Sequence, residues 1–184
     1  GVRRVRGDAS DVNTLLAAAP QAVAIYNCVN PPYNRWPELW PPMAAAFLAY
    51  AERTGAVLAT VSNLYVYGPV DGAIADGLPL AGPGTKARVR ITMWEDAKAA
   101  HDGGRIRYTE VRGSDYLCAG EQSQLGDRVT PRILAGKSVQ VLGSPDLPHT
   151  WTAPIDVARL LVTVAADPRG HGRARHGARP GEGP

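Results

Sequence analysis

Short apolar runs alternate with longer, alanine-rich stretches along most of this chain. The apolar runs predict strands at residues 2–6, 22–26, 57–61, 106–111 and 138–142, and a short extended piece at 149–152. The longer stretches predict helices at residues 11–19, 38–53, 88–101, 125–135 and 156–166. Runs of about five apolar residues that alternate with helices are typical of buried strands in βαβ units. The pattern therefore predicts an α/β fold in which helices flank a parallel sheet.

Several element ends carry local signals. Asp8 or Ser10 can cap the first helix. Pro41 and Pro42 must fall within or before the first turn of the second helix, because proline has no amide hydrogen to donate inside a helix. Gly55 then stands where a left-handed residue commonly ends a helix. About twenty residues rich in Gly, Pro and Asp follow residue 67, and they predict a surface loop.

Length and composition fit one ordinary globular domain. The chain has 184 residues, of which 45% are hydrophobic and 20% are charged. No run approaches the ~18 apolar residues of a membrane-spanning helix, and no apolar stretch follows the first arginines to form a secretory signal. We therefore expect a cytoplasmic protein that does not bind membranes.

Charge and cysteine usage narrow the function classes further. Much of the net charge of +3 comes from the first six residues and from the segment 169–179. Neither stretch interleaves aromatic residues that could stack on bases, so no nucleic-acid partner is expected. Residues 169–184 are predicted to be a disordered basic tail. Cys28 and Cys118 lie in no CxxC or Cys/His cluster, which favours free thiols and no metal site.

Polar and glycine-rich loops follow the predicted strands. Ligands of open parallel sheets bind at the carboxyl ends of the strands, where such loops gather. The sequence therefore predicts a ligand cleft there. The loops concerned are Gly7–Ser10, Asn27–Pro32, Ser62–Pro69 and Arg112–Gln124.

Five segments carry a resemblance to a known family. They are AVAIYNCVNPP at 22–32, VLATVSNLYVYGP at 57–69, RIRYTEVRGSDY at 105–116, PRILAGKSVQVLG at 131–143 and the helix that opens Asp156-Val157-Ala158. In this order they resemble the extended short-chain dehydrogenase/reductases of the NAD-dependent epimerase/dehydratase group. The resemblance runs from Val2 to about Ala166. Its most specific parts are the Ser-x-x-x-Val-Tyr-Gly-Pro element that begins at Ser62 and the series Gly136…Val141-Leu142-Gly143…Asp156-Val157-Ala158.

The resemblance implies a Rossmann-like sheet with NAD or NADP along its carboxyl edge and a small-molecule substrate. Residues 1–168 would form a partial NAD(P)-binding domain, with elements of a small C-terminal substrate lobe from about residue 113. The site residues that it implies are Asp8 near the adenine, Asn27, Cys28 and Val29 along the nicotinamide ribose, Ser62 or Asn63 beside the reacting carbon, Lys86 at a phosphate or ribose, and Arg128 and Asp156 in the substrate lobe. Three of these have plainer interpretations: a turn or cap for Asp8, a solvated lysine for Lys86 and a helix N-cap for Asp156.

The chain departs from the family pattern in its first part. Family members begin with a strand and a Gly-x-x-Gly-x-x-Gly loop that lets the backbone approach the pyrophosphate. This sequence resembles only the part after that loop, so we expect a sheet that is incomplete at its N-terminal side. A fragment, a truncated gene product or a partner that supplies the missing edge would each explain this, and a homodimer is one form of the last.

The second departure concerns catalysis. The family uses a tyrosine as proton donor or acceptor, with a lysine four residues later that lowers the phenol pKa. None of the seven tyrosines has a lysine at that spacing. Thr85, Lys86, Arg88 or Tyr65 could form a substitute proton relay. We expect an epimerase/dehydratase-like oxidoreductase acting on a sugar-like or other hydroxyl-bearing molecule, or a non-catalytic nucleotide-binding or regulatory module that kept the fold.

Overall fold

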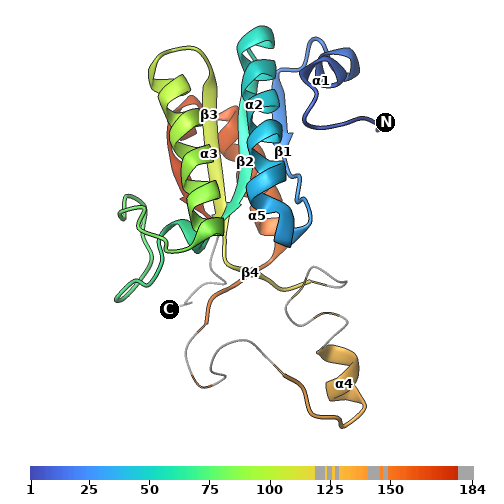
Figure 1. Ribbon diagram of the computed structural model, residues 1–184, viewed down its shortest axis with the longest axis vertical. Helices are drawn as coiled ribbons and strands as arrows, with labels where there is room; N and C mark the ends of the chain where they lie inside the picture. Colours follow the sequence, from blue (N-terminus) through green and yellow to red (C-terminus); the bar gives the residue numbers. More distant parts are fainter. Residues whose placement is uncertain (119–122, 124–125, 127–128, 141–145, 147–148, 178–184) are drawn as a thin grey trace.

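A four-stranded parallel sheet forms the centre of the molecule (Figure 1). The computed structural model describes residues 1–118, 123, 126, 129–140, 146 and 149–177. The sheet has the order β1-β2-β3-β6, where β1 is Ala24–Asn27, β2 is Val57–Asn63, β3 is Arg107–Gly113 and β6 is Ala174–His176. A second, two-stranded parallel sheet pairs β4 (Asp115–Tyr116) with β5 (Trp151–Thr152).

Helices cover both faces of the main sheet. The α-helices are α1 (Val12–Ala18), α2 (Trp36–Thr54), α3 (Thr85–Asp102), α4 (Thr130–Leu134) and α5 (Pro154–Ala166), and the short 3₁₀ turns are η1 (Tyr33–Arg35), η2 (Leu64–Val66) and η3 (Pro168–Gly170). In Figure 1, α2 and α3 lie in front of the sheet and α5 lies behind it. No helix in the described part of the chain is both long and apolar enough to cross a bilayer.

The register of the strands confirms the central sequence prediction. Ala24 pairs with Val57, and Val57 pairs with Arg107, in parallel ladders. Alternate residues of a strand face opposite sides of a sheet. Leu58 accordingly packs with the α2 and α3 side chains, whereas Val57 packs with Leu161 of α5. The α/β fold with a flanked parallel sheet is therefore confirmed.

Helix α2 begins earlier than expected, so the prediction that its two prolines fall within or before the first turn is wrong. Pro41 and Pro42 lie inside the helix, beyond the first turn that starts at Trp36. Each proline removes one backbone hydrogen bond from the helix. Trp36 and Trp40, one turn apart and almost fully buried, anchor the helix on the core and offset this loss. Gly55 ends α2 at φ 70°, in the left-handed conformation that was predicted.

The N-terminal residues do not form the strand expected at 2–6. Val2 and Val5 are exposed and pair with no other strand. The cap of α1 is Asp11 rather than Asp8 or Ser10, because the Asp11 carboxylate accepts hydrogen bonds from the Asn13 amide at 2.9 Å and from the Thr14 hydroxyl at 2.7 Å.

Residues 169–177 are ordered, in contrast to the predicted tail. They form η3 and then β6, which pairs in parallel with β3 from Glu110 to Arg112. The Thr109 hydroxyl fastens this segment by hydrogen bonds to the carbonyls of Gly170 (3.1 Å) and Arg173 (3.3 Å). Strand β6 has no apolar run because backbone bonds, rather than a buried face, hold it. The rest of the predicted tail, 178–184, lies outside the described residues.

Three C-terminal expectations need adjustment. Helix α4 covers only Thr130–Leu134 of the stretch 125–135, and residues 138–140 are not a strand, while 141–142 lie outside the described residues. Ala153, not Asp156, is the N-cap of α5, because Pro154 already fits the first helical position. Asp156 stands in the first turn and pairs with Arg159 at 3.5 Å.

The contact between Thr109 and the C-terminal segment gives a first testable expectation. Thr109→Val should lower the free energy of unfolding by about 1–2 kcal/mol, because the Gly170 carbonyl loses a buried donor and the Arg173 carbonyl keeps only the Glu110 amide. Urea denaturation measures the change. Thr163→Val is the matched control, since that threonine is exposed on α5 and donates only to the Arg159 carbonyl. Equal effects of both substitutions would contradict this account of β6.

Candidate functional site at the carboxyl edge of the sheet

All four strands of the main sheet end at the same edge, because they are parallel. The last two rows of side chains that face α2 and α3 are polar. One row runs from Asn27 through Thr60 to Glu110, and the next runs from Ser62 through Arg112 to His176. Apart from His176, these side chains are almost fully buried. Buried polar rows at this edge, in an otherwise apolar interior, mark it as the candidate ligand site.

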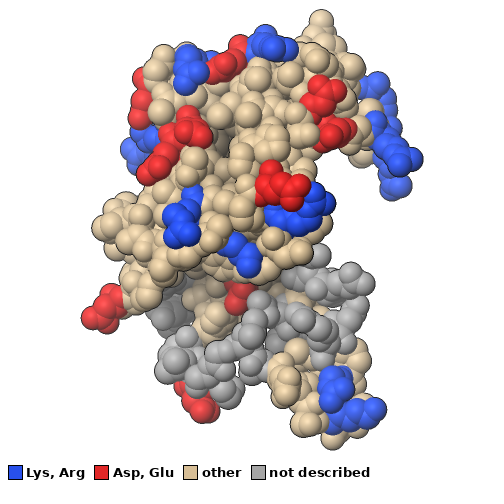
Figure 2. Space-filling view, viewed as in Figure 1, with Lys and Arg blue, Asp and Glu red and all other residues tan. Residues whose placement is uncertain are grey.

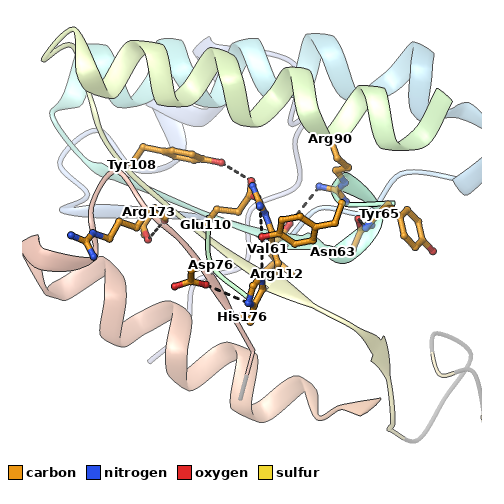
Figure 3. A network of polar contacts seen from close by, with 12 residues as sticks. Val61, Asn63, Tyr65, Asp76, Arg90, Tyr108, Glu110, Arg112, Arg173 and His176 are labelled. Carbon is orange, nitrogen blue, oxygen red and sulfur yellow. Dashed lines mark hydrogen bonds and ion pairs between the residues drawn. The ribbon is translucent and has the colours of Figure 1, made fainter. Parts of the chain in front are cut away.

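A buried ion pair lies at the centre of the two rows. The Arg112 guanidinium donates through Nε to Glu110 Oε1 at 2.7 Å, and both side chains are about 97–98% buried. Tyr108 donates to the other Glu110 oxygen at 2.8 Å. Arg112 also lies 4.9 Å above the Trp94 ring of α3. Figure 3 shows that Tyr108, Glu110 and Arg112 follow one another along β3 and face the helix layer.

The ion pair continues as a chain of contacts to the surface. Arg112 Nη1 donates to the Tyr67 hydroxyl at 2.6 Å, and that hydroxyl lies 2.9 Å from His176 Nε2. His176 Nδ1 lies 3.3 Å from an Asp76 carboxylate oxygen, in the loop that follows η2 (Figure 3). This chain therefore ties β3, β6 and the 68–84 loop together at the candidate site.

Burial is the main cause of the raised pKa values of the phenols near this edge. It raises the pKa of Tyr67, although the Arg112 guanidinium partly opposes the shift. Burial also raises the pKa of Tyr108, and the negative charge of Glu110 raises it further. The pKa values of Tyr65 and Tyr116 are raised by burial as well, while the charge of Arg90 works in the opposite direction. These phenols are neutral hydrogen-bonding groups at neutral pH.

An aromatic cluster with two cations borders the end of β2. The Arg90 guanidinium of α3 lies 4.6 Å from the Trp36 ring and 4.3 Å from the Trp40 ring. Lys86, one turn earlier on α3, places its ammonium 3.6 Å from the centre of the Tyr33 ring. Tyr33 in turn donates a hydrogen bond to the Tyr65 hydroxyl at 3.2 Å.

Buried polar atoms without a partner concentrate here. Within the described part of the chain they are Trp40 Nε1, Ser62 Oγ, Arg90 Nε, Arg112 Nη2 and the Tyr116 hydroxyl. An unpaired buried donor costs about 1–3 kcal/mol, so each is a reason to expect a ligand or water at this edge.

The predicted site residues divide into two groups. Asn27 is buried at the end of β1, where its side chain accepts from the Val29 amide at 3.3 Å, and Cys28 is exposed beside it. Ser62 is buried with a free hydroxyl, whereas the Asn63 side chain accepts from the Tyr65 amide at 3.2 Å and caps η2. All of these lie at the carboxyl ends of β1 and β2.

The other predicted residues are less closely associated with this edge. The Asp8 carboxylate is exposed and accepts from the amide and hydroxyl of Ser10, which is the turn role considered as the alternative. Lys86 packs on Tyr33, and Asp156 lies on α5 behind the sheet. Arg128 lies outside the described residues.

Sequence reasoning missed Arg90, Glu110, Arg112 and Tyr116 as members of the site. The only sequence signal for Arg90 was its spacing of four from Lys86, which puts both cations on one face of α3. Glu110 and Arg112 share a strand face by their spacing of two. No group of His, Cys, Asp and Glu suited to a metal ion occurs among the residues that the structure describes.

The structure also contains a groove between two helices. It has a volume of about 270 Å³ and runs between α2 and α3, lined by residues that include Ala44, Leu48, Val89 and Met93. Thr85, Arg88 and Val89 in the first turns of α3 also line this groove, and no described strand residue is part of its lining. On the face seen in Figure 2, acidic and basic side chains are interspersed over the described surface.

Solved structures with a similar arrangement include two dehydratases and an epimerase. The dTDP-glucose 4,6-dehydratase of Bacillus anthracis, in complex with NAD, matches with a TM-score of 0.77 and 17% identity, over 94% of this chain and 57% of that one. The fold is that of epimerase/dehydratase structures. The dTDP-glucose 4,6-dehydratase of Streptomyces venezuelae with NAD bound gives 0.75 and 21%, over 93% and 56%. The UDP-glucuronic acid 4-epimerase of Bacillus cereus in complex with NAD gives 0.74 and 14%, over 94% and 57%.

These comparisons confirm the Rossmann-like fold that the sequence predicted. Identities of 14–21% establish a common fold, and the chain spans 56–57% of the length of these structures. Neither a protein-family sequence model nor a curated protein sequence matches the chain.

The buried ion pair gives a second testable expectation. Arg112→Met should lower the free energy of unfolding by about 3–5 kcal/mol, because it leaves Glu110 charged and buried without its partner. Urea denaturation at neutral pH measures the loss. Arg105→Met is the control, since the Arg105–Glu52 pair is largely exposed and should contribute less than about 1 kcal/mol. Similar losses in the two variants would show that Arg112 has no special role.

The raised phenol pKa values give a third expectation, on alkaline stability. A phenol with a folded-state pKa above its unfolded value stays neutral while the unfolded chain ionises, so stability falls as pH rises above about 10. The urea midpoint should be level from pH 8 to 9 and then decline. In Tyr108→Phe the decline should be shallower, whatever the variant's stability at pH 8. Parallel pH profiles for both proteins would contradict the assignment.

Proposed function

We propose that this chain is part of an NAD(P)-dependent oxidoreductase of the epimerase/dehydratase kind, which acts on a sugar-like or other hydroxyl-bearing small molecule. The observation that carries the proposal is the set of buried, unpartnered polar atoms at the carboxyl edge of a parallel sheet. The similar dehydratase and epimerase structures contain NAD, which supports the cofactor assignment.

The residues at the edge suit a nicotinamide dinucleotide. Asn27, Cys28 and Val29 stand at the end of β1, where a ribose can lie against the backbone. Ser62 offers a hydroxyl that has no hydrogen-bond partner among the described residues. The bound nicotinamide would accept or donate a hydride at the substrate carbon. We also propose that the chain comprises a nucleotide-binding part and elements of a substrate lobe that begin at about residue 113.

Within this proposal the chain's own residues orient the substrate and exclude water. One of the two residues that the resemblance places beside the reacting carbon, Ser62 or Asn63, polarises the substrate oxygen there. Asn63 holds η2 in place through the Tyr65 amide, and it thereby fixes the position of the Tyr65 phenol. Tyr65 stays neutral at neutral pH, because burial and the Tyr33 contact raise its pKa, and its hydroxyl can therefore donate a hydrogen bond to the substrate.

A non-catalytic nucleotide-binding or regulatory module is the second candidate. The four phenols near this edge, at Tyr65, Tyr67, Tyr108 and Tyr116, all have raised pKa values. The sequence also lacks the Tyr-x-x-x-Lys pair that lowers a phenol pKa in the family. Both observations favour binding without rapid proton transfer. A homodimer across the free side of β1 is a further proposal.

Nucleotide binding tests the proposal directly. NAD, NADH, NADP and NADPH are each added to the chain, and the thermal midpoint is measured. At least one should raise the midpoint, since a ligand at 100 times its Kd stabilises the folded state by about 2.7 kcal/mol. Ser62→Val should reduce this rise, whereas Ser138→Val, at an exposed position, should not.

The choice between the two functions needs a second measurement. Reduced nicotinamide is followed by its absorbance while the chain and NAD or NADP are incubated with sugar nucleotides and simple polyols. Hydride transfer favours the oxidoreductase, and binding without transfer favours the module. No midpoint rise with any of the four nucleotides would overturn both.

A further inference from the structure

The unpartnered atoms at the carboxyl edge share one chemical property. Trp40 Nε1, Arg90 Nε and Arg112 Nη2 are donors only, and the hydroxyls of Ser62 and Tyr116 can also donate. None of these buried, unpartnered atoms in the described part of the chain is solely an acceptor. The group that would satisfy them must therefore be rich in acceptors.

Arg90 adds a requirement for negative charge. Its side chain is 95% buried, and among the described residues no carboxylate lies within 4 Å of it. Its one hydrogen bond, from Nη1 to the Val61 carbonyl, is long at 3.4 Å. The indole rings of Trp36 and Trp40 stabilise the cation in part, but they do not neutralise it. Burial without a counter-ion disfavours the charged guanidinium and lowers its pKa.

Among the described residues, the lack of a carboxylate within 4 Å distinguishes Arg90 from Arg112. Both arginines are almost fully buried and face the same helix–sheet interface, and Arg112 has Glu110 at 2.7 Å. Glu110 acts on Arg90 only through space, because its two oxygens already accept from Arg112 and Tyr108. In Figure 3, Arg90 descends from α3 toward Val61 at the end of β2, near Asn63 and Tyr65.

The neighbours of Arg90 belong to the same edge. Its charge acts on the phenols of Tyr65 and Tyr116. Ser62 directly follows the carbonyl that Arg90 contacts, and its side chain faces the helix layer from which Arg90 comes. Lys86 stands one turn before Arg90 and has no carboxylate partner in the described chain. Gly113 leaves room for Tyr116, because a Cβ there would lie 2.8 Å from the Tyr116 hydroxyl.

We infer that this edge binds an oxyanion group of the substrate, a carboxylate or a phosphate, through the Arg90 guanidinium and the Ser62 hydroxyl. The inference rests on the proposed function, because it names the substrate class of the same site: a hydroxyl-bearing molecule that also carries an anionic group. Lys86 raises the local positive potential at the entrance to this oxyanion site.

Stability without ligand gives the first part of the test. Arg90→Met, Ser62→Ala and Tyr116→Phe each remove an unpartnered buried polar atom, so their thermal midpoints in chloride buffer should equal or exceed that of the wild type. Tyr67→Phe is the matched control: its hydroxyl is partnered by Arg112 and His176, and its midpoint should fall by several degrees. A fall in all four variants would indicate purely structural roles and would overturn the inference.

Simple anions give the second part. Inorganic phosphate and acetate are titrated at constant ionic strength against chloride, with the midpoint and tryptophan fluorescence as readouts, since Trp36 and Trp40 contact Arg90. At least one anion should raise the wild-type midpoint and change the fluorescence. The response should be at least tenfold weaker in Arg90→Met, reduced in Ser62→Ala, and unchanged in Arg105→Met. A response to phosphate alone supports a phosphate ester, and one to acetate alone a carboxylate, while no response to either overturns the inference.

A competition experiment separates this inference from the proposed function. The anion titration is repeated with saturating NAD or NADP, whichever binds. A response that persists supports an oxyanion site for the substrate, and a response that disappears assigns the site to the cofactor phosphates and overturns the substrate assignment. If no nucleotide binds while the anion response is intact, the proposed function fails and the oxyanion site stands on its own.

Discussion

The ion pair between Glu110 and Arg112 is the interaction on which the carboxyl edge depends. Two charges that are almost fully buried must satisfy one another, and here each also finds a phenol: Tyr108 for Glu110 and Tyr67 for Arg112. Burying such a pair is costly unless its geometry is good and further hydrogen bonds are made. Because Tyr67 then contacts His176, the pair couples the central strand β3 to the strand that completes the sheet.

This arrangement explains why β6 forms from a sequence that reads as a tail. Residues 169–177 contain Gly, Arg and His and no apolar period, so the pattern of side chains gave no reason to expect a strand. The segment is held instead by the backbone ladder to β3 and by Thr109, which reaches two of its carbonyls. Such bonds depend on an edge being available, which is a tertiary property that local sequence does not encode.

The elements that sequence reasoning found are those whose cause is local or periodic. The apolar runs of β1, β2 and β3 and the left-handed Gly55 could all be read directly, and the register confirms their parallel order. The position of the two prolines inside α2 could not be predicted. Burial of Trp36 and Trp40 offsets the lost helix hydrogen bonds only once the core has formed. The candidate site divides in the same way. Ser62 and Asn27 follow strands and could be named, whereas Arg90 and Tyr116 enter the site only through packing.

Two buried guanidinium groups therefore lie at this edge, and among the described residues only that of Arg112 has a carboxylate partner. The Arg112 charge is neutralised by Glu110 within the fold, although Arg112 Nη2 has no hydrogen-bond partner among the described residues. Arg90 is not neutralised by any described carboxylate, and neighbouring hydroxyls are left without partners as well. A fold selected for stability alone would replace such a group by an apolar one, because unpaired buried charge is among the largest single costs in a protein interior. Retaining it is reasonable where a ligand supplies the missing acceptors, and the loss of stability in the free protein then becomes selectivity for an anionic substrate.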